Sequence, residues 1–381
     1  MKLELIILLL SLLTKNLAIE IPNNESNCKN ECGELTKTRI VIVKIGGSSI
    51  TEKAQLETLN ESALDWFSKS IKSAMMSSVN DRFIIVHGAG SFGHYHAKKY
   101  GFKGVSVPKE VVTKNEKRHA EVLNELHFST KMGQGLSKTR LSVQKLHLAL
   151  ISSLIDNDIN AVGLSPFSIS PILDDFGLES LSTSITQSIN HGMIPVIHGD
   201  AIFTKDNDLH VESKYSRDVE PSSSVGILGG DDIVLAIASH FAKEQNILSI
   251  EENRVCRKTQ DQMEVSVVFI TDVDGVFTSD PKLNDDAELV KLLYVSNDGI
   301  IQTSSQSDQD KNINASKSSH DHDVTGGLES KLRSAVTIAS KGIKVAIVKC
   351  NSESAQGALR GQHFPIGTTI QLHSNFEECS I

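Results

Sequence analysis

The feature that most constrains this chain is an apolar run that stops abruptly at a cluster of glycines. Phe83 to Val86 is a short run of large apolar residues, typical of a strand buried in a parallel sheet. The next eight residues, from His87 to His94, contain three glycines, one serine and two histidines. Glycines directly after a strand let backbone N–H groups approach an anion, and a helix that begins there adds a favourable dipole. This junction predicts a pocket for a phosphorylated small molecule, to which a loop histidine donates a further hydrogen bond.

A second junction of the same kind lies upstream, where the run from Arg39 to Ile45 leads into Gly46 and Gly47. Lys44 would be costly to bury without a partner, so we expect it to be paired or to face a ligand. Glycines after strands also serve as plain turns, and Lys53 is equally compatible with a solvated position at a helix start. Neither junction has the spacing of a P-loop or of a GxGxxG fingerprint. The chain must therefore hold phosphates in another way.

Strand and helix patterns alternate along the chain, which predicts a parallel sheet covered by helices on both faces. Only 5% of the residues are aromatic, so we expect an aliphatic core, as is usual for buried parallel strands. Helices are expected at residues 57–76, 109–155 and 181–190, and from the Asp231–Asp232 pair to residue 242. The polar stretches 244–264 and 304–322 are expected to be surface insertions.

The N-terminal segment, residues 1–20, has an apolar run from Leu5 to Leu13, which fits a signal peptide better than a membrane span. A polar linker is expected at residues 21–37. The compartment stays open between the cytoplasm and an organelle to which a signal-like segment would direct the chain. The net charge of −9 argues against general binding to nucleic acid or to an anionic membrane. The five cysteines form no obvious zinc or disulfide framework.

Three segments carry a resemblance: KIGGSSIT at residues 44–51, HGAGSFGH at 87–94 and DVTGGLESK at 323–331. They resemble the amino acid kinase superfamily, and within it the isopentenyl phosphate kinases, from roughly Thr38 to the end. The histidine of SFGH, His94, distinguishes that branch, and the fosfomycin kinases are the nearest alternative. The resemblance implies an α/β fold, an amino acid kinase-like αβα sandwich with a central, mainly parallel sheet. The implied domain covers residues 38–376, with a substrate-side half at about 38–220 and a nucleotide-side half at about 221–376.

The activity implied by the resemblance is ATP-dependent phosphorylation of isopentenyl phosphate to isopentenyl diphosphate, a step of isoprenoid precursor synthesis. The attacking group would be an anionic phosphate oxygen, so positioning and charge neutralisation matter more than a general base. Two alternatives stay open: a kinase for another small phosphate or phosphonate, such as fosfomycin, and a nucleotide-binding regulator without catalysis. ATP and Mg²⁺ are expected, the metal held chiefly by phosphates and water. A homodimer is also expected, without nucleic-acid or stable membrane partners.

The resemblance also implies roles for individual residues. Lys44 and Lys53 would neutralise the transferring phosphoryl group, and His94 would hydrogen-bond the substrate phosphate. Contacts to ATP are expected from Lys44, Gly46, Gly47, Ser48, Gly90, Asp231, Asp272, Gly326, Gly327 and Lys331. Contacts to the substrate are expected from Ala89, Gly90, His94, Gly199 and Asp200.

Other polar residues have ordinary structural explanations. Asp231 lies at the start of a predicted helix, where an aspartate usually serves as the N-cap. His119, His127 and His147 lie in the long helical region. We expect them at the surface or in helix packing, because no pair of them sits at the i, i+4 spacing beside a carboxylate that a zinc site requires.

Overall fold

The computed structural model of the chain describes residues 37–105, 130–172, 174–204, 225–254, 263–279, 281, 284–303 and 327–373. These residues lie in one compact unit, Thr36–Ile381. The signal-like segment, residues 21–36 of the linker, the insertion at 304–322, residues 109–129 and Gly326 lie outside the described residues. Within the described ranges, no helix is both long enough and apolar enough to cross a bilayer.

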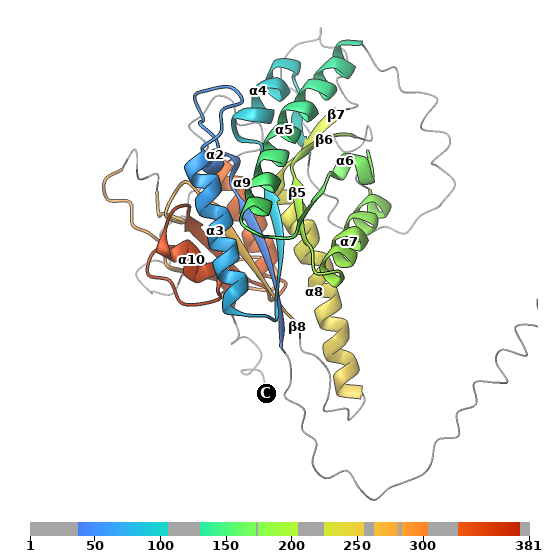
Figure 1. Cartoon of the computed structure of the whole chain (residues 1–381). Helices are drawn as coiled ribbons and strands as arrows, with labels where there is room; N and C mark the ends of the chain where they lie inside the picture. Colours follow the sequence, from blue (N-terminus) through green and yellow to red (C-terminus); the bar gives the residue numbers. More distant parts are fainter. Residues whose placement is uncertain are drawn as a thin grey trace, which may run out of the picture. The chain divides into compact units, whose positions relative to one another are not determined.

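In the described part of the chain, nine strands form the central sheet, in the order β10–β9–β12–β11–β8–β1–β2–β5–β4 (Figure 1). They are β1 (Thr38–Ile45), β2 (Asp81–His87), β4 (Ala161–Leu164), β5 (Ile194–His198), β8 (Met263–Thr271), β9 (Leu292–Val295), β10 (Ile301–Thr303), β11 (Lys344–Lys349) and β12 (Thr368–Leu372). Neighbouring strands are parallel except for the pairs β9–β10 and β11–β12. The prediction of a mainly parallel sheet is confirmed.

A second sheet has three strands in the order β3–β7–β6. They are β3 (Lys103–Val105), β6 (Asp200–Phe203) and β7 (Val225–Leu228). Gly199 is the single residue between the end of β5 and the start of β6. The chain therefore passes from the central sheet to the small one at Gly199.

Helices cover both faces of the central sheet, as the alternation of side chains along β1 requires. Ile40 and Ile42 belong to a core that includes α7, α8 and α9, whereas Val41 and Val43 belong to a core that includes α3, α5 and α10. The helices are α2 (Gly47–Ile50), α3 (Glu61–Ser77), α4 (Gly90–Tyr100), α5 (Thr130–Asp156), α6 (Pro166–Ile169), α7 (Asp175–Asn190), α8 (Gly230–Arg254), α9 (Gly327–Ala339) and α10 (Glu353–Leu359). The αβα sandwich is confirmed.

Three helix boundaries differ from the sequence-based expectation. The helix α8 continues to Arg254, so the expected insertion at 244–264 is wrong for its first half; that stretch contains no glycine or proline to end the helix. At the other end of the stretch, Met263 already belongs to β8. The helix α3 begins only at Glu61, because the Asn60 side chain accepts a hydrogen bond from the Ala63 N–H. The helix α7 begins earlier than expected, after the N-cap Asp174.

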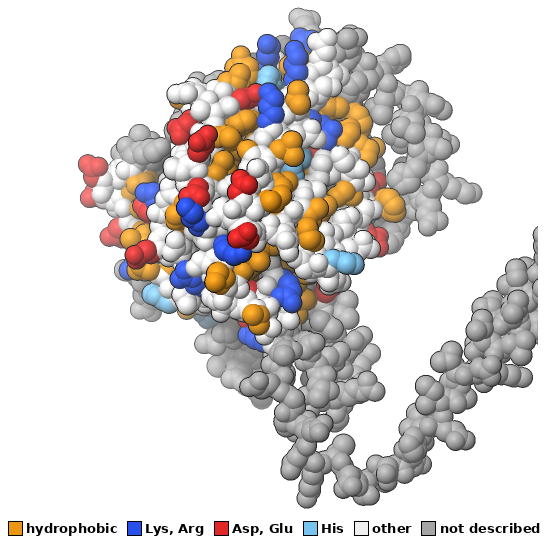
Figure 2. Space-filling model, in the orientation of Figure 1, with side chains coloured by type: hydrophobic (Ala, Val, Ile, Leu, Met, Phe, Trp, Pro, Cys, Tyr) orange, Lys and Arg blue, Asp and Glu red, His pale blue; other side chains and the backbone are white. Residues whose placement is uncertain are grey.

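Charges of both signs are mixed on the face drawn in Figure 2. Lys and Arg side chains alternate with Asp and Glu there, and apolar side chains lie between them. Such a mixture contrasts with the continuous basic stripe that binding to a nucleic-acid backbone requires.

The first turn of α8 carries two carboxylates with opposite surroundings. Both Asp231 and Asp232 lie inside this turn, so the N-cap interpretation of Asp231 is wrong. Burial opposes ionisation of Asp231, but the ammonium groups of Lys331 and Lys44 outweigh it and hold the pKa of this carboxyl below its usual value. Burial and the neighbouring charge of Asp231 raise the pKa of Asp232 to about 6.

We predict that Asp232→Asn raises the free energy of unfolding at neutral pH. A carboxyl group with a raised pKa binds more protons in the folded than in the unfolded chain between its ordinary 3.8 and about 6. Stability is therefore lost as the pH rises through that window, and a permanently neutral asparagine avoids the loss. Urea unfolding should give nearly equal stabilities at about pH 4 and a more stable variant at about pH 7.

Asp231→Asn is the matched control, because Asp231 is the adjacent residue and its pKa is shifted in the opposite direction. The lowered pKa of Asp231 means that its ionised form stabilises the fold at neutral pH and that this contribution disappears on acidification. The variant should therefore be less stable than the wild type at about pH 7. Two variants that shift stability in the same direction would contradict this assignment of charges.

Candidate active site

Two glycine loops meet at the carboxyl ends of β1 and β2. A Cβ atom on Gly47 would lie only 2.1 Å from the backbone nitrogen of Gly90, and one on Gly88 would lie 2.8 Å from the nitrogen of Gly47. Gly90 also has a φ of +54°, in the left-handed region that favours glycine. No larger residue fits at Gly47 unless the two loops separate. The sequence predicted both loops, and the structure places them against each other.

Thr51 ties the two loops together, a role that the sequence did not reveal. Its hydroxyl donates to the carbonyl of Gly47 (2.8 Å) and accepts from the backbone N–H of Ser91 (3.0 Å). The side chain is buried. One hydroxyl thus connects the loop after β1 with the first turn of α4.

Lys44 is buried and paired, as its position in an apolar strand predicted. Its Nζ lies 2.9 Å from Oδ1 of Asp231, and Nζ of Lys331 lies 4.0 Å from Oδ2 of the same carboxylate. Three residues assigned to ATP from the sequence, on β1, α8 and α9, therefore gather at one point. Two ammonium groups thus approach one carboxylate in a buried place.

Lys53 lies in the turn between α2 and α3 and reaches to the end of β8. Its Nζ is 2.5 Å from Oδ2 of Asp272, and both side chains are partly exposed. Burial opposes ionisation of Asp272, but the contact with Lys53 and the Thr271 hydroxyl hold the pKa of Asp272 below its usual value. The structure thus brings together another pair that was assigned to the phosphoryl group and the nucleotide.

His94 lies on α4, one turn after its start at Gly90, and is half-buried. His96, on the same helix, lies 3.9 Å from a carboxylate oxygen of Glu57. The other oxygen of Glu57 lies 2.5 Å from Nζ of Lys145 on α5.

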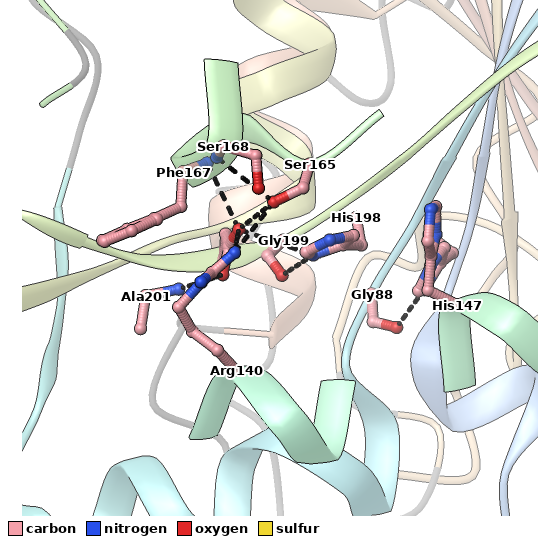
Figure 3. Close-up of polar contacts among 11 residues, drawn as sticks. Gly88, Arg140, His147, Ser165, Phe167, Ser168, His198, Gly199 and Ala201 are labelled. Carbon is pink, nitrogen blue, oxygen red and sulfur yellow. Dashed lines mark hydrogen bonds and ion pairs between the residues drawn. The ribbon is translucent and has the colours of Figure 1, made fainter. Parts of the chain in front are cut away.

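Asp200 fixes the turn between β5 and β6 through buried contacts; Figure 3 labels its partners Arg140, Ser165, Phe167 and Ala201. Its carboxylate accepts from the guanidinium of Arg140 (2.9 Å) and from the hydroxyl of Ser165 (3.0 Å). Backbone N–H groups of Ala201 and Phe167 donate to the same carboxylate. The side chain is fully buried, so its contacts join β6 to α5 and to the start of α6. Arg140, another residue that the sequence analysis missed, also stacks on the ring of Phe167, 4.0 Å from its centroid.

The remaining predicted residues lie around these loops. Ala89 and Gly199 follow the ends of β2 and β5, and the Gly199 N–H donates to the carbonyl of His87 (3.2 Å). Gly46 donates to the carbonyl of Ile270 on β8 (2.8 Å), and Ser48 lies in α2. Gly327 is the first residue of α9.

Three helices of more than one turn, α4, α8 and α9, begin at Gly90, Gly230 and Gly327. A Cβ atom on Gly230 would lie 3.5 Å from Cε of Lys44, so the start of α8 adjoins the buried lysine. Helix N-termini carry partial positive charge and free N–H groups, which suits phosphate oxygens.

Metal ligands do not gather in the part of the chain that the structure describes: no three His, Cys, Asp or Glu side chains are placed to hold an ion. The carboxylates nearest the glycine loops, Asp231 and Asp272, are each paired with lysine.

The model of the amino acid kinase family matches this chain over residues 39–260 and 261–349. An isopentenyl phosphate kinase of Arabidopsis thaliana is 29% identical over 358 residues, covering 84% of this chain and 90% of the relative. One from Thermoplasma acidophilum is 27% identical over 334 residues, covering 87% of this chain and all of the relative.

Solved structures of isopentenyl phosphate kinase share the fold. One matches with a TM-score of 0.54 and 23% identity, and the T. acidophilum product complex matches with a TM-score of 0.53 and 24% identity. Each match covers 87% of this chain and 100% of the other. The family model covers most of the chain. The chain belongs to the amino acid kinase family.

Proposed function

We propose that this protein transfers the γ-phosphoryl group of ATP to isopentenyl phosphate, forming ADP and isopentenyl diphosphate. The observation that carries the proposal is the meeting of two glycine loops at the ends of β1 and β2, with Lys44 at one loop and His94 at the other. The relatives named above are isopentenyl phosphate kinases, and they match 84% and 87% of this chain.

The attacking atom in this reaction is an oxygen of the substrate phosphate, which is already an anion. The site therefore has to bring two anions together and neutralise the charge of the transferring group. Lys44 and its neighbour Lys331 supply buried positive charge. Lys53 supplies partly exposed positive charge from the turn between α2 and α3. Charges fixed in a buried place stabilise a developing charge more strongly than charges in water.

The two ligands are assigned to opposite sides of the loop contact. ATP phosphates would lie against Gly46, Gly47 and the start of α9, because the two glycines follow Lys44 at the end of β1 and Lys331 lies near the start of α9. The substrate phosphate would lie at the start of α4, where backbone N–H groups and His94 donate to it. Gly47 and Gly90 mark the place where the two phosphates meet.

Magnesium fits this donor set as an ion carried by the nucleotide. Mg²⁺ keeps several waters and is usually bound by one or two carboxylates together with substrate phosphates. Asp231 and Asp272 are the carboxylates within reach of the proposed ATP site, and each already balances a lysine. When bound, the ion neutralises phosphate charge. The homodimer stays a prediction that rests on the family resemblance.

Turnover on a panel of acceptors tests the proposal. With ATP fixed, isopentenyl phosphate should give the highest kcat/KM among alkyl monophosphates and fosfomycin, and ³¹P NMR should show a diphosphate product. A higher kcat/KM with fosfomycin would make the protein a phosphonate kinase. ATP binding without turnover of any acceptor would favour a nucleotide-binding regulator.

His94→Ala should raise KM for isopentenyl phosphate about 10-fold or more and lower kcat, with little change in KM for ATP. The reason is the loss of one hydrogen bond to a charged group, which contributes about 1.5–3 kcal/mol. His94→Gln keeps a donor and should retain part of the activity. His96→Ala is the matched control on the same helix, and it should leave KM for isopentenyl phosphate nearly unchanged. Equal effects of the two alanine variants would remove His94 from the phosphate site.

Lys44→Ala should lower kcat and kcat/KM together by about 100-fold or more, with ATP binding intact, because the lysine acts mainly in the transition state. Lys53→Ala should lose less. Lys44→Ala also leaves Asp231 with one partner, which costs stability. Kinetics measured well below the unfolding temperature of the variant separate the two effects, because a folded Lys44→Ala enzyme should still show the loss of kcat. A Lys44→Ala enzyme that loses only ATP affinity would make Lys44 a binding residue alone.

A further inference from the structure

Three histidines from three different elements meet close to the ends of β2 and β5; Figure 3 labels two of them, His147 and His198. His87 ends β2, His198 ends β5 as its neighbour in register, and His147 lies on α5. All three are buried. The ring centroids of His147 and His198 are 4.6 Å apart, and those of His87 and His147 are 5.2 Å apart. The sequence analysis expected His147 at the surface or in helix packing. It is buried against His87, His198 and Gly163, and nothing in the sequence linked it to the other two histidines.

The contacts of His87 fix the position of its ring proton. Its Nδ1 lies 3.0 Å from the carbonyl oxygen of Gly88. A carbonyl oxygen can only accept, so Nδ1 donates. Burial and the nearby His198 lower the pKa of His87 to about 3, so the ring is neutral at physiological pH and carries a single proton. That proton is on Nδ1, and Nε2 is left with a lone pair.

His147 supplies the donor that this lone pair needs. Its Nδ1 lies 3.0 Å from Nε2 of His87, and because that nitrogen accepts, Nδ1 of His147 donates. Burial lowers the pKa of His147 to about 2, so this ring is also neutral. Space for the ring is provided by Gly163 on β4, where a Cβ atom would lie 2.6 Å from Nε2 of His147. The position is therefore built for an imidazole.

The two hydrogen bonds, from His147 to His87 and from His87 to the Gly88 carbonyl, end on the Gly88–Ala89 peptide. In a trans peptide the carbonyl and the N–H point in opposite directions. With its carbonyl held inward by His87, the Gly88–Ala89 peptide turns its N–H outward, toward the start of α4 at Gly90. The same arrangement recurs at the end of the neighbouring strand β5, where Nδ1 of His198 donates to the carbonyl of Gly199 (2.9 Å).

We propose that His147 is a positioning residue: through His87 it orients the Gly88–Ala89 peptide so that its N–H donates to the acceptor phosphate. His147 touches neither ligand, and it acts by donating to Nε2 of His87, which holds the ring in the orientation from which Nδ1 reaches the Gly88 carbonyl. The identity of the phosphate rests on the proposed function, whereas the tautomer does not.

Metal binding is a weaker explanation of the same cluster. Both ring nitrogens of His87 are already occupied, one by a carbonyl and one by a ring nitrogen of His147. The described residues contain no group of three side chains placed to hold an ion. A hydrogen-bonded relay uses these nitrogens, and a metal site would have to break it.

The first test is the tautomer of His87 in the wild-type protein. Two-bond ¹H–¹⁵N correlation spectra distinguish a ring proton on Nδ1 from one on Nε2, and the signals of His87 are assigned by their loss in His87→Asn. We expect the Nδ1–H form. A ring proton on Nε2 would overturn the proposal without any measurement of activity.

The second test compares two variants of His147. Asparagine places an amide N–H₂ close to the position of Nδ1, whereas leucine fills the space and offers no donor. His147→Leu should raise KM for isopentenyl phosphate about tenfold and leave KM for ATP within about twofold. The ring proton of His87 should stay on Nδ1, opposite the Gly88 carbonyl, while the ¹⁵N signal of Nε2 shifts because its lone pair has lost a donor. His147→Asn should restore KM and the wild-type Nε2 signal. Equal loss in both variants, or a parallel rise of both KM values, would mean a structural role only.

Two further outcomes are decisive. If His147→Leu does not fold, the wild-type tautomer together with the His147→Asn kinetics decides the question, since asparagine keeps the donor. If the wild type has the Nδ1–H ring but does not turn over isopentenyl phosphate, the proposed function fails while the assignment of His147 stands. In that case the KM comparison is made with the acceptor that the panel identifies.

Discussion

The backbone contact between Gly47 and Gly90 is the constraint on which the rest of the site depends. A side chain at Gly47 would overlap the nitrogen of Gly90, so the loops after β1 and β2 approach as closely as two backbones can. Because β1 and β2 are parallel neighbours, both loops lie at the same edge of the sheet. Thr51 fills the narrow space beside the contact and holds it with two hydrogen bonds. Two phosphates that each bind one loop are thereby brought next to each other.

The contact between the two loops would bring negative charges close together when phosphates bind. The buried lysines already supply positive charge there before binding. The chain has a net charge of −9, so attraction of phosphates must come from local cations. Asp231 holds Lys44 and Lys331 in place and is itself kept ionised by them. The two ammonium groups are thereby fixed in position before any ligand arrives. Preorganised charge of this kind needs no rearrangement during the reaction.

Features of the fold and the site that depend on neighbouring residues could be predicted from the sequence, whereas contacts between distant segments could not. Strands that end in glycines, such as Arg39 to Gly47, are local signals, and the parallel sheet, both loops and Lys44 were predicted from them. The end of α8 was misjudged because polar residues without glycine or proline continue a helix as readily as they form a loop. Contacts between distant segments, such as Thr51 with Ser91 or Arg140 with Asp200, leave no periodic trace in a sequence. The partners of a buried polar group are set by topology, which a residue pattern does not encode.

The histidines illustrate why neutral polar groups suit the layer beneath a phosphate site. A neutral imidazole donates through one nitrogen and accepts through the other, so His147 and His87 form a directed chain that ends on the Gly88 carbonyl. A lysine in that layer would add a buried charge that competes with Lys44 for the phosphates, and a carboxylate would oppose their binding. An apolar residue would leave the carbonyl and the lone pair unsatisfied, which costs free energy in a buried place. Burial keeps both rings neutral, and this neutrality lets the charged residues alone determine where the anions bind.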